Sequence, residues 1–478
     1  MKHFPALFLG ALVFASISHS PVFAQSSGGS SVSSSSTVAS TTSMERPFLT
    51  THYDLYEIGE APQPTRIQTD LEALVSFGTR HTLSDTVSET RGIGAARRWI
   101  FEEFEKISAE CGGCLEVFYV SGVVSGEQRI PNPTNVVNVV AVQWGETDPM
   151  RMALMAGDID SRVSDGMDFT SDSPGANDNA TGVAGALEAA RVLTKYTFPS
   201  TIVYAALSGE EQGLFGGEIL AKYALEQGWD INAVLNNDMI GNIEGINGVI
   251  DNRTIRVFSE GTRAVETERD ARFRRFTGGE VDSPSRNLAR YIKKLGENYL
   301  YNTEIMMIYR LDRFGRGGHH RPFNEAGIPG VRIMETWEHY DRQHQDIRVE
   351  DGIAYGDVLE KVNMEYTAKA TGLNAITLAS LAASPPPPAN VRVLGAVQPS
   401  TTLIWDKADP ETNPHIKGYI VHWRLTDQPM WQWHRYVGDV SEFTLENIVI
   451  DNYYFGVSAV SDSGFESPVV FPGPSGSF

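Results

Sequence analysis

Six acidic side chains stand where a parallel sheet would bring them together. Apolar runs over 151–157, 201–207 and 233–237 predict buried strands, and acids follow the last residue of each run. One more acid lies in a loop just before a helix that is predicted to start near Thr181. The set comprises Asp158, Asp160, Asp178, Glu210, Glu211 and Asp238. Ligands of open α/β sheets bind outside the carboxyl ends of the strands, so we expect these side chains to line one crevice.

Several carboxylates in one crevice repel each other unless a cation neutralises them. A divalent metal site is therefore the simplest interpretation. The adjacent pair Glu210 and Glu211 suits hydrolysis, because one side chain can bind the metal while the other takes a proton from the attacking water. A metal ion also makes a coordinated water easier to deprotonate. The alternative for any single acid is a helix cap or a solvated surface residue.

Strand and helix patterns alternate from residue 47 to residue 384. Further strands are predicted over 136–144 and 330–334, and helices over 181–194, 212–227, from Pro284 onward after the cap Ser283, and over most of 353–381. This alternation predicts an α/β fold with three layers, an α/β/α sandwich around a mostly parallel mixed sheet.

The tail has a different pattern. Residues 385–388 are four prolines, which favour an extended linker. Residues 389–478 contain short alternating strands and no helical pattern, which predicts an all-β sandwich. The stretch 453–464, together with Trp405, resembles part of a fibronectin type III domain. Such a module acts as a spacer or binds a surface, a protein or a glycan.

The amino-terminal residues predict export. Residues 1–24 have a short positive start, an apolar run and small residues before Gln25, as in a secretory signal peptide cleaved between Ala24 and Gln25. An uncleaved anchor is the alternative. Residues 25–46 form a Ser-rich linker. We therefore expect a secreted or periplasmic protein, with no later stretch apolar enough to span a membrane.

Charge and cysteine usage agree with this compartment. The formal net charge is -21, which makes nucleic acid an improbable partner because phosphate backbones are repelled. The two cysteines, Cys111 and Cys114, are separated by two glycines. In an oxidising compartment this spacing favours a structural disulfide over redox or metal chemistry, and two cysteines alone cannot complete a four-ligand zinc site.

Three ordered motifs carry a family resemblance. They are Pro174-Gly-Ala-Asn-Asp178-Asn-Ala-Thr-Gly182, Ser208-Gly209-Glu210-Glu211-Gln-Gly213 and Leu235-Asn-Asn-Asp238-Met239-Ile-Gly241. In this order they strongly resemble the two-zinc aminopeptidase family, which includes bacterial leucyl aminopeptidase, glutamate carboxypeptidase and glutaminyl cyclase. The resemblance spans about residues 90–380 and implies an α/β/α sandwich.

The resemblance also implies a role for each matching residue. Asp178 corresponds to the aspartate that bridges two metal ions, and Glu210 to the general base. Glu211 and Asp238 correspond to metal ligands. Asp160 corresponds to an aspartate that orients the ligands of the site.

Two positions depart from the family pattern. The family has a histidine ligand where this chain has Asp158, and a charged oxygen in its place favours harder ions. Zinc, as one or two ions, is the expected cofactor, with Mn, Mg or Ca as alternatives. The last family ligand is a histidine four residues before an aspartate, but Arg342 stands four residues before Asp346. His344 is the nearest replacement, followed by Asp341 and His339.

A nearby pair of histidines leaves a further alternative open. The segment Gly317-Gly318-His319-His320 resembles a family segment that usually reads Asp-His. His320 takes the retained histidine position, either near the site or as a structural residue. His319 is a second candidate for a replaced ligand.

The predicted function is that of an exported, metal-dependent exopeptidase acting on peptides. Acids near the mouth of the site could hold a free α-amino group, which favours an aminopeptidase. The basic segment 309–316 could instead receive a carboxylate, or be a solvated loop. Two other hypotheses remain: a non-catalytic binding protein with a degenerate, metal-stabilised peptidase site, and acyl transfer of the glutaminyl cyclase kind.

Overall fold

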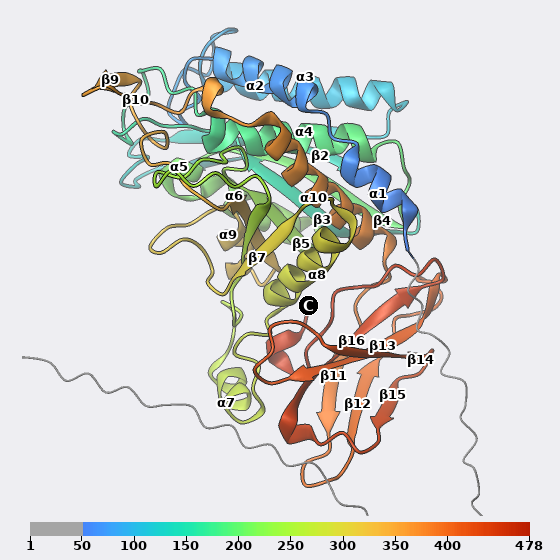
Figure 1. Ribbon diagram of the computed structural model, residues 1–478. Helices are drawn as coiled ribbons and strands as arrows, with labels where there is room; N and C mark the ends of the chain where they lie inside the picture. The colour runs from blue at the N-terminus through green and yellow to red at the C-terminus, as the bar shows by residue number, and fades with distance from the viewer. Residues whose placement is uncertain (1–50) are drawn as a thin grey trace, which may run out of the picture. The chain divides into compact units, whose positions relative to one another are not determined.

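The computed structural model describes residues 51–478, which belong to one compact unit (Figure 1). The predicted signal peptide (1–24) and the predicted Ser-rich linker (25–46) both lie outside the described residues. Within 51–478, no helix is both long and apolar enough to cross a bilayer. The predicted disulfide is present and joins Cys111 to Cys114 at the end of a helix.

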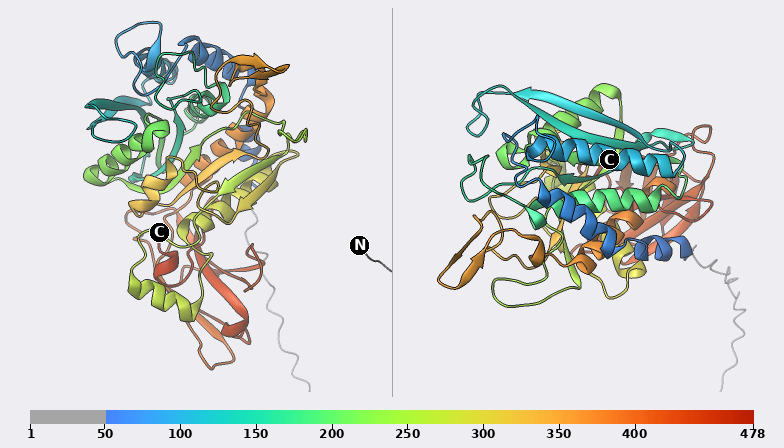
Figure 2. Two further views of the ribbon diagram at one scale, coloured as in Figure 1. Left: turned by 90° about the vertical axis from the view of Figure 1, so that its left-hand side faces the viewer. Right: turned by 90° about the horizontal axis from the view of Figure 1, so that it is seen from above.

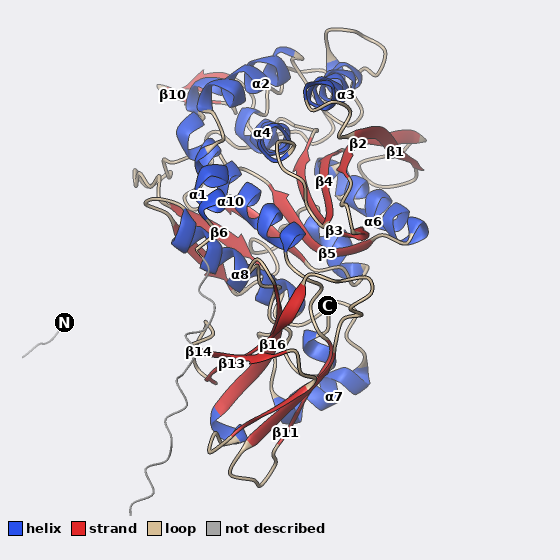
Figure 3. Ribbon diagram, turned by 90° about the vertical axis from the view of Figure 1, so that its right-hand side faces the viewer, coloured by secondary structure: helices blue, strands red, loops and turns tan. Residues whose placement is uncertain are grey.

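An eight-stranded mixed sheet is the centre of the fold, with the strand order β1-β2-β4-β3-β5-β8-β6-β7 (Figure 3). The strands are β1 (Glu116–Val124), β2 (Thr134–Gln143), β3 (Asp148–Asp158), β4 (Ser200–Leu207), β5 (Asp230–Asn237), β6 (Thr254–Phe258), β7 (Glu304–Ile308) and β8 (Gly330–Glu335). The neighbours β4, β3, β5 and β8 run parallel, so their carboxyl ends meet at one edge. The predicted α/β architecture is confirmed.

The helices cover both faces of this sheet, and α3 and α4 lie side by side (Figure 2). The α-helices of residues 51–478 are α1 (Tyr53–Glu60), α2 (Pro64–Ser76), α3 (Gly92–Glu110), α4 (Thr181–Leu193), α5 (Glu210–Gly213), α6 (Phe215–Gln227), α7 (Glu268–Thr277), α8 (Pro284–Tyr299), α9 (His320–Glu325) and α10 (Met364–Ala383). Helix α7 lies beside residues 474–476 of the tail and not on the sheet (Figure 1). Helix α8 begins as predicted, because the Ser283 side chain accepts a hydrogen bond from the backbone N–H of Arg286 and Pro284 follows the cap.

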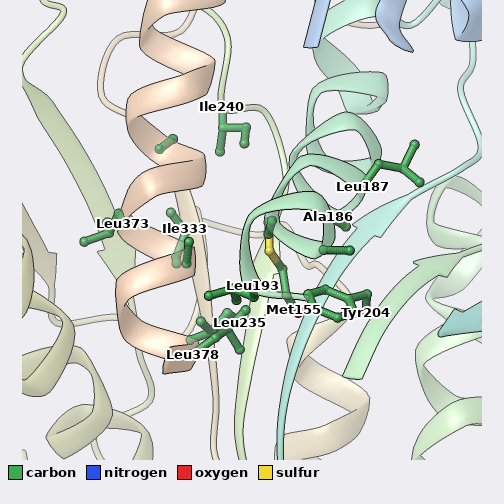
Figure 4. Close-up of a cluster of buried hydrophobic side chains, with 14 of the residues drawn as sticks. Met155, Ala186, Leu187, Leu193, Tyr204, Leu235, Ile240, Ile333, Leu373 and Leu378 are labelled. Atoms are coloured by element: carbon green, nitrogen blue, oxygen red, sulfur yellow. The ribbon is translucent and has the colours of Figure 1, made fainter. Parts of the chain in front are cut away.

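Two hydrophobic clusters explain why the central strands read as unbroken apolar runs. In β4, Ile202 and Tyr204 belong to the cluster under α1–α4, α8 and α10, whereas Val203 and Ala205 belong to the cluster under α6 and α9. Successive strand residues point to opposite faces, and here both faces are buried. Figure 4 shows part of the first cluster, where Leu373 of α10 and Ala186 of α4 are buried together with strand residues such as Tyr204.

Several predicted boundaries were wrong. The helix expected from residue 353 starts at Met364, because 353–355 pair with 348–350 in a hairpin, β9 (Arg348–Glu350) and β10 (Ile353–Tyr355), and Asn363 caps α10. The helix expected over 212–227 is split between α5 and α6 at Leu214, whose φ is 66°. Sequence reasoning also missed β1, β6 and β7, of which β1 is largely exposed at an edge.

The tail forms two three-stranded antiparallel sheets, β11-β12-β15 and β14-β13-β16. The strands are β11 (Ala389–Leu394), β12 (Thr401–Asp406), β13 (Ile416–Leu425), β14 (Trp433–Gly438), β15 (Glu442–Leu445) and β16 (Tyr453–Ser461). Trp405, Tyr419 and Val457 lie in their shared core. The all-β prediction is confirmed, and the fibronectin type III assignment stays a prediction.

Buried ionic contacts join the tail to α8 and the loop before it. Arg424 of β13 donates two hydrogen bonds to Asp282, at 2.7 and 2.9 Å, and Arg290 of α8 donates a third at 2.9 Å. All three side chains are buried. Glu466 accepts a hydrogen bond of 2.6 Å from Lys294 of α8. The tail therefore completes the burial of charged groups on the α/β part of the chain.

Candidate metal centre

Three of the predicted ligands come together. Nε2 of His344 lies 2.9 Å from Oδ2 of Asp178 and 2.9 Å from Oε1 of Glu211. One ligand atom from each of the three residues lies within 4.8 Å of the other two. Two carboxylates and one imidazole form a donor set suited to zinc. The residues present therefore fit one metal ion at this position.

Different elements position these three side chains. Asp178 stands in the π-helical turn Ala176–Ala180 before α4, where the side chain of Asp357 accepts hydrogen bonds of 2.8 and 2.7 Å from the backbone N–H groups of Asn177 and Asp178. Glu211 lies in α5, directly after β4. His344 lies between β8 and β9, in a left-handed conformation with φ 52°. The last candidate ligand, His344, thus comes from a loop. Its position could not be fixed by counting residues back from Asp346.

The two carboxyl groups and the imidazole favour each other's charged forms. Burial opposes ionisation of Asp178 and Glu211, but the neighbouring His344 lowers the pKa of both carboxyl groups. Burial likewise opposes the charge on His344, and the same two carboxylates raise the pKa of its imidazole. Arg162 adds a hydrogen bond of 2.7 Å to Oε2 of Glu211. Neighbouring basic groups thus favour the ionised form of both carboxyl groups.

Glu210 lies beside this cluster without belonging to it. Burial, followed by the charges of Glu211 and Asp238, raises its pKa well above the ordinary value. A cleft of about 860 Å³ reaches Glu210 and the three candidate ligands. Its other lining residues include five arginines: Arg129, Arg162, Arg313, Arg316 and Arg321. A group that favours taking a proton thus faces a space large enough for part of a peptide.

Asp160 lies behind the pair Glu210 and Glu211. Its carboxylate accepts hydrogen bonds of 3.2 and 3.0 Å from the backbone N–H groups of these two residues, and a third of 3.0 Å from the hydroxyl of Thr82. Asp160 is fully buried, and burial, then the charge of Glu211, raises its pKa to about 6. Its contacts fix the start of α5 against the end of β3.

Asp158 does not join the cluster. Its Oδ1 lies 2.5 Å from Nδ1 of His319, and its Oδ2 accepts a hydrogen bond of 2.7 Å from the side chain of Asn179. Burial raises the pKa of Asp158 to about 8 and lowers that of His319 to about 4. Burial thus favours the uncharged form of both groups in this pair.

Asp238 is also bonded elsewhere. Its Oδ2 lies 2.8 Å from Nη2 of Arg332, which sits in the middle of β8. The other end of the guanidinium, Nη1, lies 3.0 Å from Oδ1 of Asp312. Sequence reasoning missed Arg332, although a charged residue inside the apolar run 330–334 was a visible signal.

The remaining candidate histidines serve the surrounding structure. His320 is fully buried, and its Nε2 lies 2.9 Å from the carbonyl oxygen of Leu311 and 3.6 Å from Oδ2 of Asp312. His339 and Asp341 stay outside the group of candidate ligands. Asp357, which orients the Asp178 turn, was not considered from the sequence and carries no motif that would identify it.

Comparisons with known proteins show which family the sequence resembles. The family model described as Peptidase family M28 matches residues 138–356. A "Probable zinc metalloprotease" of Pyricularia oryzae is 42% identical over 424 residues, covering 87% of this chain and 84% of the relative. One of Leptosphaeria maculans is 42% identical over 410 residues, covering 86% of this chain and 94% of the relative.

Solved structures show the same fold. The LapA aminopeptidase of Legionella pneumophila superposes with a TM-score of 0.52 at 21% identity, covering 71% of this chain and 79% of that chain. This likeness concerns the arrangement of the sheet and its helices.

Proposed function

Since the chain belongs to peptidase family M28 and is a zinc metallopeptidase, we propose that it is an exported aminopeptidase in which Glu210 is the general base. The observation that carries this proposal is the convergence of Asp178, Glu211 and His344 in the cleft that also reaches Glu210. Export rests on the signal-peptide pattern of residues 1–24.

Asp178, Glu211 and His344 would hold the zinc ion. Bound zinc polarises a carbonyl group and lowers the pKa of a coordinated water. Glu210 would take the proton of the attacking water and pass it to the leaving amine, because it lies at the same cleft and its pKa is raised by burial and by neighbouring acids. Asp160 would keep Glu210 in place through the backbone.

The charges around the cleft favour a free amino terminus at the reacting end. Glu210 and Asp238 are acidic, whereas the arginines of the cleft include Arg313, Arg316 and Arg321. An α-ammonium group is attracted to the carboxylates, and the carboxylate-bearing end of a short peptide is attracted to the arginines. This polarity orients a peptide with its amino end at the metal.

The test compares blocked and free substrates. Zinc-loaded protein should release the fluorophore from leucyl-aminomethylcoumarin and not from its N-acetylated form. Glu210→Gln should keep its zinc and lose about 10²–10⁴-fold in kcat. The matched control is Glu127→Gln, at the rim of the same cleft, which should keep most of the activity.

Two results would count against the proposal. Equal cleavage of blocked and free substrates would exclude an aminopeptidase, and release of carboxyl-terminal residues instead would favour a carboxypeptidase. Full activity of Glu210→Gln would remove Glu210 from its role. Cyclisation of amino-terminal glutamine without hydrolysis would point to acyl transfer.

A further inference from the structure

Next to the proposed zinc site lies the position where two-zinc relatives would hold a second metal ion. Resemblance to two-zinc enzymes implies that Asp158 and Asp238, together with the bridging Asp178, hold a second ion. The structure tests whether the residues present fit it. Asp158 uses one carboxylate oxygen towards His319, at 2.5 Å, and the other towards Asn179, at 2.7 Å. Both carboxylate oxygens of Asp158 therefore already bond to side chains of the protein.

A positive charge already lies against Asp238. Nη2 of Arg332 is 2.8 Å from Oδ2 of Asp238, and Nη1 is 3.0 Å from Oδ1 of Asp312. Arg332 is 0% exposed, so water does not screen these contacts. A guanidinium keeps its charge at any pH that the protein meets. The chain itself therefore supplies a positive charge between Asp238 and Asp312, next to the position of the second metal ion.

The geometry leaves no second set of donors. Oδ1 of Asp238 is buried without a hydrogen-bond partner. A single oxygen does not make a site, and within residues 51–478 only Asp178, Glu211 and His344 form a group of three such side chains within 4.8 Å. Nε2 of His319 is also buried without a partner, yet it belongs to no such group.

We propose that this chain binds one zinc ion, at Asp178, Glu211 and His344, and that the guanidinium of Arg332 takes the place of the second metal ion. The residues at 158 and 319 fit this proposal. Where the family has histidine this chain has Asp158, and where the family has aspartate it has His319. These two side chains bond to each other. This inference rests on the proposed zinc site and specifies its metal content.

Zinc stoichiometry tests the inference independently of activity. The full chain is saturated with zinc, freed of loosely bound metal by a weak chelator, and measured by elemental mass spectrometry. One zinc per chain supports the inference. Two zinc ions per chain would overturn it and leave the proposed function intact, whereas no zinc would overturn both.

Variants of Arg332 test the role of the guanidinium. Arg332→Met removes the cation and frees Asp238, so its zinc content should rise from one towards two per chain in excess zinc. Arg332→Lys keeps a cation and should stay at one. If Arg332→Met also stays at one while folded, the guanidinium does not exclude the second ion and that part of the inference fails.

Cobalt substitution of the wild-type protein tests whether one or two metal ions are bound, even when Arg332→Met does not fold. One Co²⁺ per chain gives an electron paramagnetic resonance signal whose integrated intensity matches the cobalt content. Two ions sharing Asp178 would be magnetically coupled, with reduced intensity. A coupled signal would contradict a single-metal site.

Discussion

The carboxylate of Asp160 accepts a hydrogen bond of 3.0 Å from the backbone N–H of Glu211. This contact ties the end of β3 to the start of α5 and so fixes both Glu211 and its neighbour Glu210. Because Asp160 bonds to the backbone of Glu211 and not to its carboxylate, its influence on catalysis is one of position.

We predict that Asp160→Asn lowers kcat by about 10–100-fold while the zinc content stays unchanged. The amide can accept only one of the two hydrogen bonds from the backbone N–H groups of Glu210 and Glu211. Steady-state kinetics and zinc analysis check this. An unchanged kcat would show that the backbone of the pair is held by other contacts.

Loss of His344 should remove the metal. His344→Ala deletes one of three donors, so we expect zinc affinity to fall by more than about 100-fold. Competition with a fluorescent chelator measures this. His339→Ala, in the same loop but outside the group of candidate ligands, is the matched control and should keep its zinc. Equal zinc affinity of the two variants would assign the last ligand elsewhere.

The tail should stabilise the whole chain through one buried ion pair. Arg424→Met leaves the fully buried Asp282 with Arg290 as its one remaining charged partner, so we expect the free energy of unfolding to fall by about 3–5 kcal/mol. Urea denaturation measures the change. Arg392→Met, on the exposed face of β11, should shift it by less than about 0.5 kcal/mol.

Glu260 should make stability depend on pH. Burial raises its pKa to about 7, above the value near 4.5 of a free glutamate. The contribution of Glu260 to the free energy of unfolding is therefore fully present below about pH 4.5. It is lost as the pH rises through 7, by up to about 3 kcal/mol.

Glu260→Gln should remove this dependence. Between pH 5 and pH 8 the variant should lose less stability than the wild type in thermal unfolding, because no carboxyl group ionises at this buried position. Glu268→Gln, an exposed change on α7, should follow the wild-type curve. Parallel curves for the wild type and Glu260→Gln would contradict the buried ionisation.

The sequence indicated the fold because the central strands are buried on both faces. Runs such as 201–207 have no polar interruption, and the acids that follow them mark the edge of the site. The exposed edge strand β1 and the short strands β6 and β7 lack this signal. Helix α10 was predicted too early because Asn363, its cap, was overlooked.

The partners of the acids could not be inferred from the sequence. Asp158 bonds to His319 and Asp238 to Arg332 across large sequence separations, and local patterns do not encode which distant side chain fills a space. The sequence pointed to five candidate ligands, but only the fold separates the three that converge from the two that pair elsewhere.

A crystal structure with anomalous diffraction at the zinc absorption edge tests the central claim most directly. We predict one anomalous peak per chain, at about 2.0–2.2 Å from ligand atoms of Asp178, Glu211 and His344. The absence of a peak there from zinc-saturated crystals would contradict the account, and a second peak between Asp158 and Asp238 would show that Arg332 does not replace a metal ion.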